Sequence, residues 1–304
     1  MLQNCNLCPR QCGADRELGK TGFCNCAEDP VVSSICVHKG EEPVLCGEKG
    51  VCNVFFAHCN MQCCFCQNID ISCNNSEVCR FNSLESVVQR IAEVLAETEN
   101  MLGFVSPSHQ VHCIPQILDR LHQMGLHPTT IYNTNAYDTV ETLRQLEPYI
   151  DIYLPDFKYS DNRLAERYSR TPRYFEIAAK ALLEMYRQKG STLITDERDI
   201  ARSGLIIRHL VLPGCAENSK NALSWIAENL SVNVHLSLMA QYYPPEKAGT
   251  LPDALNRFVL PEEYAEVCEH SHRLGFHRGW EQELSQQIVY QPHFENNDSF
   301  EQNT

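Results

Sequence analysis

The chain has 304 residues, of which 43% are apolar, enough to bury the core of one large α/β domain with an appendage. Its formal charge of -14 argues against nonspecific binding to nucleic acid or to an anionic membrane surface. The segment from Met1 to Cys5 is polar, and no apolar run reaches the roughly twenty residues that a membrane helix needs. We therefore expect a cytoplasmic protein without a secretory signal.

The 17 cysteines dominate the first part of the chain, because twelve of them lie before residue 67. Cysteines in the cytoplasm serve more often as metal ligands or reactive groups than as disulfides. Residues 1–50 combine cysteines with glycine and charged residues, lack helical periodicity, and are expected to form a cysteine-rich metal-binding cap. A β-hairpin is expected within it, running from 31–37 back through 39–43.

The cap offers four or five closely spaced thiols: Cys5, Cys8, Cys12 and Cys24, with Cys26 as a further candidate. Four thiolates make a closed site, typical of structural zinc or of an auxiliary [4Fe-4S] cluster, and the spacing does not separate the two. A segment with so few apolar side chains cannot fold alone, which favours a structural role. An electron relay is the alternative.

From residue 51 short apolar strands alternate with amphipathic helices, which is the pattern of a parallel sheet. Strands are predicted at 51–57, 101–105, 129–133, 150–154, 204–212 and 232–238, and helices at 84–95, 114–124, 140–146, 174–188 and 220–229. Six successive βα units predict a partial (β/α)6 TIM-like barrel over residues 51–285, with a doubly wound sheet as the alternative. Residues 286–304 are expected to form a flexible tail.

The first predicted strand leads into Cys59, Cys63 and Cys66, with Phe65 directly before the last cysteine. A four-iron cluster needs four ligands, and an electron-carrier cluster normally receives all four from the protein. Three thiolates leave one iron open to a substrate or cofactor, so the spacing predicts chemistry at iron. Cys64 breaks this spacing and is left out of the ligand set.

Polar groups follow each of the other predicted strands. Functional groups of a parallel barrel sit at the C-terminal ends of its strands, so these groups are expected to gather at one face. The candidates are Ser108, His109, Asn133, Asn135, Asp156, Lys158, Arg208, His209, Cys215 and Tyr242. Turn-forming residues follow strands in most proteins, but turn formation does not account for the charged pair Asp156 and Lys158. Only one of Arg208 and His209 can face the interior, because neighbouring strand residues point to opposite faces.

Together these residues resemble the radical S-adenosylmethionine superfamily, and in particular the relatives of pyruvate formate-lyase activating enzyme that carry an N-terminal cysteine motif. The three-cysteine spacing with its aromatic residue matches the superfamily's cluster motif. The segments 134–137, 156–161 and 207–214 resemble the activating enzymes' Asp-Thr-Asn-Gly, Asp-Leu-Lys and Arg-x-x-Val-x-Pro-Gly motifs. The resemblance covers nearly the whole chain.

The sequence departs from the activating enzymes at three places. Their Gly-Gly-Glu motif, which holds the amino group of the cofactor, is replaced by the segment 106–109. The Asp before Thr-Asn is Asn133 here, and Tyr242 stands about where they place a His on the sixth strand. His109 is the candidate replacement for the missing Glu, and Tyr242 and Cys215 are the candidate catalytic residues.

The resemblance implies an iron–sulfur enzyme of the oxidoreductase type with a [4Fe-4S] cluster and S-adenosylmethionine as cofactors. An electron delivered at Cys59, Cys63 and Cys66 would cleave S-adenosylmethionine to a 5′-deoxyadenosyl radical, which takes a hydrogen atom from an unknown substrate. The implied cofactor-binding residues are Asp156, Lys158, Asn133, Asn135, Ser108, His109, Arg208 and His209. A flavodoxin- or ferredoxin-type electron donor is implied, and a partner protein is one candidate substrate.

Two other functions stay open from the sequence. One is an activase that places a glycyl radical on a partner protein, which the barrel kinship supports and the altered motifs oppose. The other is a non-catalytic iron–sulfur or zinc scaffold, for which the loss of Gly-Gly-Glu is the best support. Neither a membrane nor a nucleic acid is expected as a partner.

Overall fold

A computed structural model describes residues 2–245, 251–284 and 294 of the protein. The tail predicted at 286–304 therefore lies outside the described residues, apart from Phe294. Among the helices that are described, none combines the length and the apolar run needed to cross a bilayer.

The strands of the described residues form one nine-stranded sheet whose order follows the sequence, β1-β2-β3-β4-β5-β7-β8-β9, with β6 paired to β7. The strands are β1 (Val32–His38), β2 (Val51–Phe56), β3 (Met101–Val105), β4 (Thr129–Thr134), β5 (Ile152–Pro155), β6 (Ile194–Thr195), β7 (Ala201–Leu210), β8 (His235–Met239) and β9 (Gly279–Glu281). Pairing is parallel throughout, except between β1 and β2 and between β6 and β7. The order never reverses, as it would in a doubly wound sheet, so the partial TIM-like barrel is confirmed.

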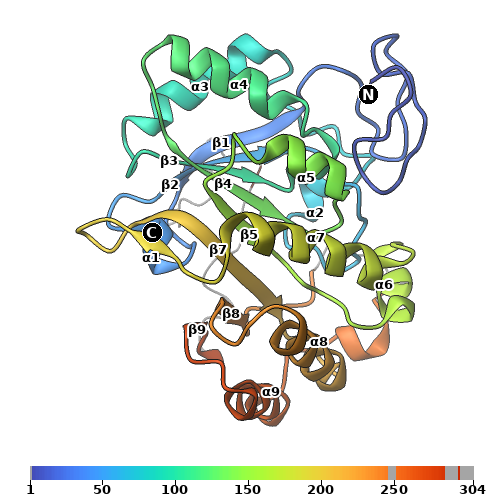
Figure 1. The fold of residues 1–304 in the computed structure, drawn as a ribbon. Helices are drawn as coiled ribbons and strands as arrows, with labels where there is room; N and C mark the ends of the chain where they lie inside the picture. Colours follow the sequence, from blue (N-terminus) through green and yellow to red (C-terminus); the bar gives the residue numbers. More distant parts are fainter. Residues whose placement is uncertain (1, 246–250, 285–293, 295–304) are drawn as a thin grey trace.

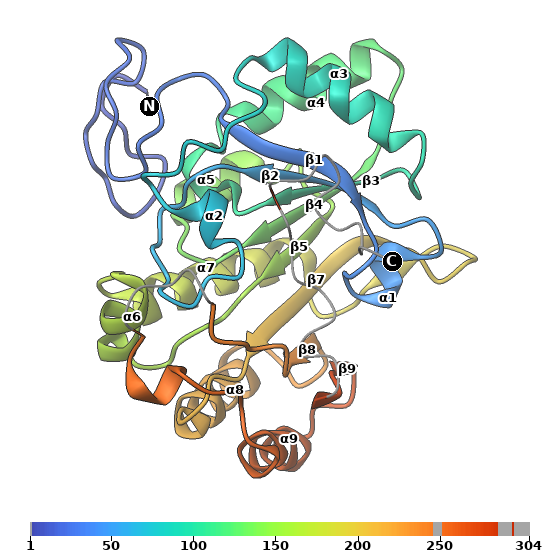
Figure 2. The ribbon, with the colours of Figure 1, turned by 180° about the vertical axis from the view of Figure 1, so that it is seen from behind.

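Helices follow the parallel strands and cover one side of the sheet. They are α3 (Leu84–Leu95), α4 (Cys113–Gln123), α5 (Val140–Leu146), α6 (Asn162–Ser169), α7 (Tyr174–Lys189), α8 (Ala216–Asn229) and α9 (Pro261–Leu274). Figure 1 shows α3 and α4 over one end of the sheet, α5 and α7 over its middle, and α8 and α9 over the other end. The view from behind in Figure 2 looks onto the opposite face of the strands.

The periodicity of α3 shows why these helices form and where they pack. Its apolar residues recur at helical spacing, and Val87, Ile91 and Val94 are buried against the sheet. The side chain of Ser83 accepts a hydrogen bond from the backbone N–H of Ser86 and caps the first turn. The bounds of α3 match the prediction.

The first strand differs from the prediction, since it belongs to the main sheet. β1 pairs antiparallel with β2, and the connection between them contains the short helix α1 (Pro43–Cys46) rather than a returning strand at 39–43. The predicted boundary at residue 50 therefore divides a hairpin. The physical reason is that β1 is almost fully buried, so its apolar side chains need the sheet and not a polar cap.

A small apolar cluster closes the barrel at the N-terminal ends of its strands. Val51, Met101, Ile131 and Ile152 meet there, and α1 covers them with Leu45. This end of the barrel is thus packed, and the opposite, C-terminal end of the strands is where a cavity can form.

Candidate active site

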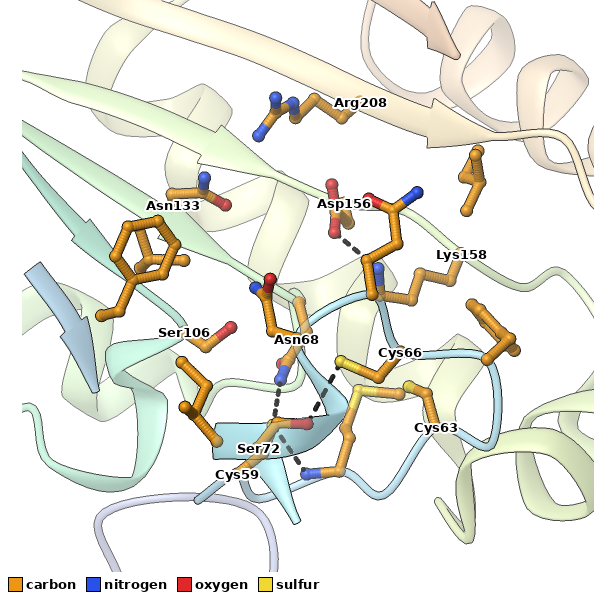
Figure 3. A pocket seen from close by; sticks show the side chains of 18 of the residues that line it. Cys59, Cys63, Cys66, Asn68, Ser72, Ser106, Asn133, Asp156, Lys158 and Arg208 are labelled. Carbon is orange, nitrogen blue, oxygen red and sulfur yellow. Dashed lines mark hydrogen bonds and ion pairs between the residues drawn. The ribbon is translucent and has the colours of Figure 1, made fainter. Parts of the chain in front are cut away.

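The segment after β2 carries three cysteines to one cavity at the C-terminal end of the strands. Cys59, Cys63 and Cys66 all line it, and the short helix α2 (Ile69–Ser72) closes the loop that holds them. Figure 3 shows this loop facing the side chains that come from the ends of β3, β4, β5 and β7. The predicted ligand set therefore converges on one space.

Each of the three sulfurs accepts a hydrogen bond from a different part of the chain. The donors are the backbone N–H of Met61 to Cys59 at 3.3 Å, the hydroxyl of Ser169 to Cys63 at 2.9 Å and the hydroxyl of Ser72 to Cys66 at 3.2 Å. The side-chain amide of Asn135 also lies 3.4 Å from the sulfur of Cys59. Hydrogen bonds to the sulfur atoms stabilise thiolates and are a feature of iron–sulfur ligation.

Cys59 is buried, Cys63 and Cys66 are half-buried, and a nearby cation would favour the thiolate form of all three. Burial raises the pKa of Cys59 and Cys66, and it raises that of Cys63 to about 12. Three hydrogen-bonded sulfurs that line one cavity are the kind of ligand set that an iron–sulfur cluster uses.

Asp156 and Lys158 follow β5 and face the cysteine loop across the cavity (Figure 3). The ammonium of Lys158 lies 2.5 Å from a carboxylate oxygen of Asp156. Burial acts to lower the pKa of Lys158, but Asp156 and Cys63 outweigh it and the pKa is raised. The lysine thus stays charged beside the sulfurs. The hydroxyl of Tyr174 accepts a hydrogen bond from the backbone N–H of Lys158 at 2.9 Å, and fixes this turn.

The two asparagines at the end of β4 make different contacts. Asn133 lines the cavity with its side chain. The amide nitrogen of Asn135 donates to the side-chain oxygen of Asn60 at 2.8 Å, and its oxygen accepts from the backbone N–H of Tyr137 at 2.9 Å. Asn135 therefore ties the cysteine loop to the end of β4 while it still reaches the cavity wall.

Of the neighbouring pair on β7, Arg208 faces the cavity and His209 does not. The guanidinium of Arg208 forms ion pairs with Glu41 at 2.9 Å and with Glu42 at 3.0 Å, both just before α1. His209 is fully buried on the other face and its Nδ1 donates to the carbonyl of Phe157 at 2.6 Å. Burial lowers the pKa of His209 to about 4, so it is neutral at pH 7.

At the end of β3 the structure brings Ser106 to the cavity in place of Ser108 and His109. Ser106 adopts a left-handed backbone with φ 52°, a conformation that glycine takes most easily. The chain then turns into the 3₁₀ helix η1 (Pro107–His109), which points the next side chains away. Ser108 bonds to Thr134, and Nε2 of His109 donates to the carbonyl of Ala57 at 2.8 Å.

The two candidate catalytic residues do not line this cavity in the described structure. Tyr242 is buried and its hydroxyl donates to the carbonyl of Leu255. Cys215 precedes α8 and is also buried. The residue before Tyr242, Gln241, takes the cavity position, because successive residues of an extended chain point to opposite sides.

Sequence reasoning missed several amide and hydroxyl groups of the cavity. Gln67 and Asn68 directly follow the third cysteine, and Gln67 donates to the carbonyl of Gln241 at 2.7 Å, which joins the cysteine loop to the end of β8. Ser72 ends α2 and donates to the sulfur of Cys66. The only available signal was their position next to the cysteines.

The N-terminal cysteines gather at a second place, around the buried guanidinium of Arg16. Its Nη2 donates to the sulfur of Cys24 at 3.1 Å, and its Nη1 donates to the carbonyl of His109 at 2.8 Å. A hydrogen bond from Cys26, ahead of the charge of Arg16, lowers the pKa of Cys24 to about 6. Burial, followed by the nearby Cys24 and Cys5, raises the pKa of Cys8 to about 12.

The remaining two cysteines of this group, Cys12 and Cys26, differ in exposure. Cys12 is exposed and packs on Gly22, where an added Cβ would lie 2.2 Å from its sulfur. Cys26 is buried and its sulfur lies 3.4 Å from Nδ1 of His58, at the end of β2. The structure thus brings all five predicted thiols to one region, and Cys26 contacts His58 at the end of β2.

Two comparisons with proteins of known sequence connect this chain to others, although no family model matches it. It is 32% identical over 279 residues to an uncharacterised protein of Methanocaldococcus jannaschii, covering 88% of this chain and 74% of that protein. It is 21% identical over 182 residues to the lipoyl synthase of Beutenbergia cavernae, which spans 53% of each chain.

A solved structure shares the fold. The structure of SuiB from Streptococcus suis superposes with a TM-score of 0.51 at 11% identity, over 75% of this chain and 47% of that one. At this identity the likeness concerns the fold alone, and it agrees with the parallel barrel.

Proposed function

We propose that this chain, which belongs to one family with the Methanocaldococcus jannaschii protein, is a radical S-adenosylmethionine enzyme that cleaves S-adenosylmethionine reductively and uses the product to take hydrogen from a substrate. The observation that carries this proposal is the set of three hydrogen-bonded thiols that faces the Asp156–Lys158 pair across one cavity. Cys59, Cys63 and Cys66 would hold a [4Fe-4S] cluster, since the sulfurs fit that group. When bound, the cluster supplies the electron that breaks S-adenosylmethionine into methionine and a 5′-deoxyadenosyl radical.

The charged pair is suited to the amino-acid end of S-adenosylmethionine. Lys158 offers a buried ammonium for the carboxylate, and Asp156 holds it in place and keeps it protonated. Asn133 adds an uncharged amide at the same wall. Ser106, rather than Ser108 or His109, is placed to accept a hydrogen bond from the cofactor's amino group, because its side chain reaches the cavity.

Arg208 forms the far wall of the cavity and is oriented by two carboxylates. Its ion pairs with Glu41 and Glu42 fix the guanidinium, and desolvation strengthens these contacts. Phe55, Val105 and Leu210 complete the wall with apolar surface. Such a wall excludes water from the space beside the cofactor, which a hydrogen-abstracting radical requires.

The N-terminal thiols would hold a second, closed metal site. We propose Cys5, Cys8, Cys12 and Cys24 as its ligands with Cys26 as an alternative, and either zinc or a second cluster as the metal. Support comes from the grouping of these thiols around Arg16 in a segment that lacks regular secondary structure. Iron and zinc analysis of the purified protein distinguishes the two metals.

The proposal is tested by anaerobic reconstitution with iron and sulfide, followed by dithionite and S-adenosylmethionine. We expect 5′-deoxyadenosine, measured by liquid chromatography and mass spectrometry. Cys63→Ala should lose the cluster absorbance and the product. Cys64→Ala is the matched control, since the neighbouring thiol is not a ligand here. A wild-type protein that keeps its cluster but forms no 5′-deoxyadenosine would identify a scaffold and refute the enzyme.

A further inference from the structure

The cysteine loop has a second, outer cavity on the side that faces away from the proposed cofactor site. Cys63 and Ser72 line both cavities, so one layer of the loop separates them. The outer cavity is further lined by Phe23, Arg167, Tyr168 and Arg170. Figures 1 and 2 place α6, α2 and the N-terminal segment on the same side of the molecule.

We propose that this outer cavity is the docking surface for a small acidic electron-carrier protein with a one-electron redox group at its surface. The inference rests on the proposed function, because the reductive cleavage consumes one electron that the chain itself does not supply. The carrier is oxidised by one electron, and S-adenosylmethionine takes up that electron as the bond between its sulfur and C5′ breaks.

The charge of the outer cavity favours such a partner. Of the described residues that line it, two are arginines and none is Asp or Glu, although the whole chain carries a formal charge of -14. The net negative charge of the chain as a whole repels an acidic protein, and the arginines mark a place where approach is favourable. Arg167 and Arg170 are both exposed, and the guanidinium of Arg167 lies 5.6 Å from the ring centre of Tyr168.

The composition of the surface is that of a protein interface. Phe23 is 37% exposed, and the guanidinium of Arg10 stacks on its ring at 3.8 Å from the centre. Aromatic and arginine side chains are enriched in the cores of interfaces, where they combine apolar area with directed hydrogen bonds. A small anion would need only the arginines and would not explain the exposed ring.

The surface is joined to the cluster ligands by short contacts. The carbonyl of Tyr168 accepts from the backbone N–H of Cys64 at 2.8 Å, and the hydroxyl of Ser169 donates to the sulfur of Cys63 at 2.9 Å. These residues directly precede Arg170. A carrier on this surface would therefore lie against the segment that holds Cys63, while the cofactor side of the loop stays free for substrate.

The test measures binding and electron delivery separately. The double variant Arg167→Glu/Arg170→Glu is compared with Arg120→Glu/Arg273→Glu, which changes the charge equally on α4 and α9. Purified flavodoxin and a purified ferredoxin are the probes, with the reconstituted full chain. Dissociation constants are measured at low and at high salt, and 5′-deoxyadenosine is measured with either reduced carrier or dithionite.

We expect the outer-cavity variant to bind the carrier at least about tenfold more weakly at low salt, with carrier-driven product falling in parallel. Dithionite-driven product should stay at the wild-type level, and the control variant should bind like the wild type. The surface is refuted if neither carrier binds the wild type, or if both double variants bind equally. If the carrier binds in a charge-dependent way but dithionite yields no 5′-deoxyadenosine, the proposed function fails while the docking surface stands.

Discussion

The two cysteine-rich parts of the chain are built in different ways. The loop at Cys59, Cys63 and Cys66 starts from a parallel strand, and each sulfur receives a hydrogen bond from a separate element. Over residues 2–31, by contrast, no helix or strand forms within the described chain. The sheet positions the loop without the help of a metal, whereas the cap is held to the barrel by contacts of individual side chains.

Those contacts are few and specific. Arg10 donates to the carbonyls of Asn60 and Arg170 at 2.8 and 2.7 Å, and Arg16 donates to the carbonyl of His109. The backbone of Leu7 accepts from the hydroxyl of Thr142 at 2.8 Å. A site held by the barrel can keep an open coordination position for chemistry, while a segment with so little structure of its own needs a closed site to fold.

The largest expected effect compares one cysteine from each region. Cys59→Ala should abolish 5′-deoxyadenosine formation, because an open cluster cannot lose one of three ligands. Cys8→Ala should remove the cap metal and leave dithionite-driven product within about threefold of wild type. Iron content and product are measured on the same samples. If Cys8→Ala loses product with a flavodoxin but keeps it with dithionite, the cap is an electron relay rather than a structural site.

A smaller effect is expected from Arg16→Met, which keeps the apolar stem of a buried side chain and removes its charge. Two hydrogen bonds are lost, to the carbonyl of His109 and to the sulfur of Cys24. We expect a loss of about 2–3 kcal/mol in the free energy of unfolding and faster proteolysis within residues 1–31. Lys20→Met, an exposed position of the same segment, is the control. Equal urea midpoints for both variants would contradict the role given to Arg16.

The strands and helices of the barrel were predictable because their signal is local. The bounds of α3 and α5 agree with the hydrophobic periodicity, and β3 agrees with its apolar run. The cysteine spacing likewise identifies the loop without any structure. β1 was predicted as a strand at 31–37, but its place in the main sheet was not, because the pattern of one strand does not show which other strand it pairs with.

Which of two neighbouring residues faces the cavity was harder to predict. Gln241 lines it where Tyr242 was expected, and Ser106 lines it where Ser108 and His109 were expected. The period of two along an extended chain is visible in the sequence, but its phase is set by packing against other elements. At Ser106 the left-handed turn changes the direction of the chain, and a serine gives no sign of that conformation.

The smallest expected effect concerns His109, which lies at the junction of the two regions. Its carbonyl accepts from Arg16 of the cap, and its Nε2 donates to Ala57, two residues before Cys59. Nδ1 is buried without a hydrogen-bond partner among the described residues. Burial, opposed by the bond to Ala57 and reinforced by Arg16, lowers the pKa of His109 from 6.5 to about 3.

The sign of the pH dependence follows from this lowered pKa. Above pH 6.5 His109 is unprotonated in both the folded and the unfolded chain. Below pH 6.5 it takes up a proton in the unfolded chain, whereas in the folded chain it does so only at about pH 3. Stability is therefore lost as the pH falls through this window, by about 1.4 kcal/mol per pH unit for this histidine. His109→Gln keeps a donor for Ala57 and cannot titrate, so its urea unfolding between about pH 7 and pH 5 should show a shallower loss. The control His277→Gln changes an exposed histidine, so its free energy of unfolding should vary with pH as in the wild type. If His109→Gln shows that same pH dependence, the junction does not couple protonation to folding.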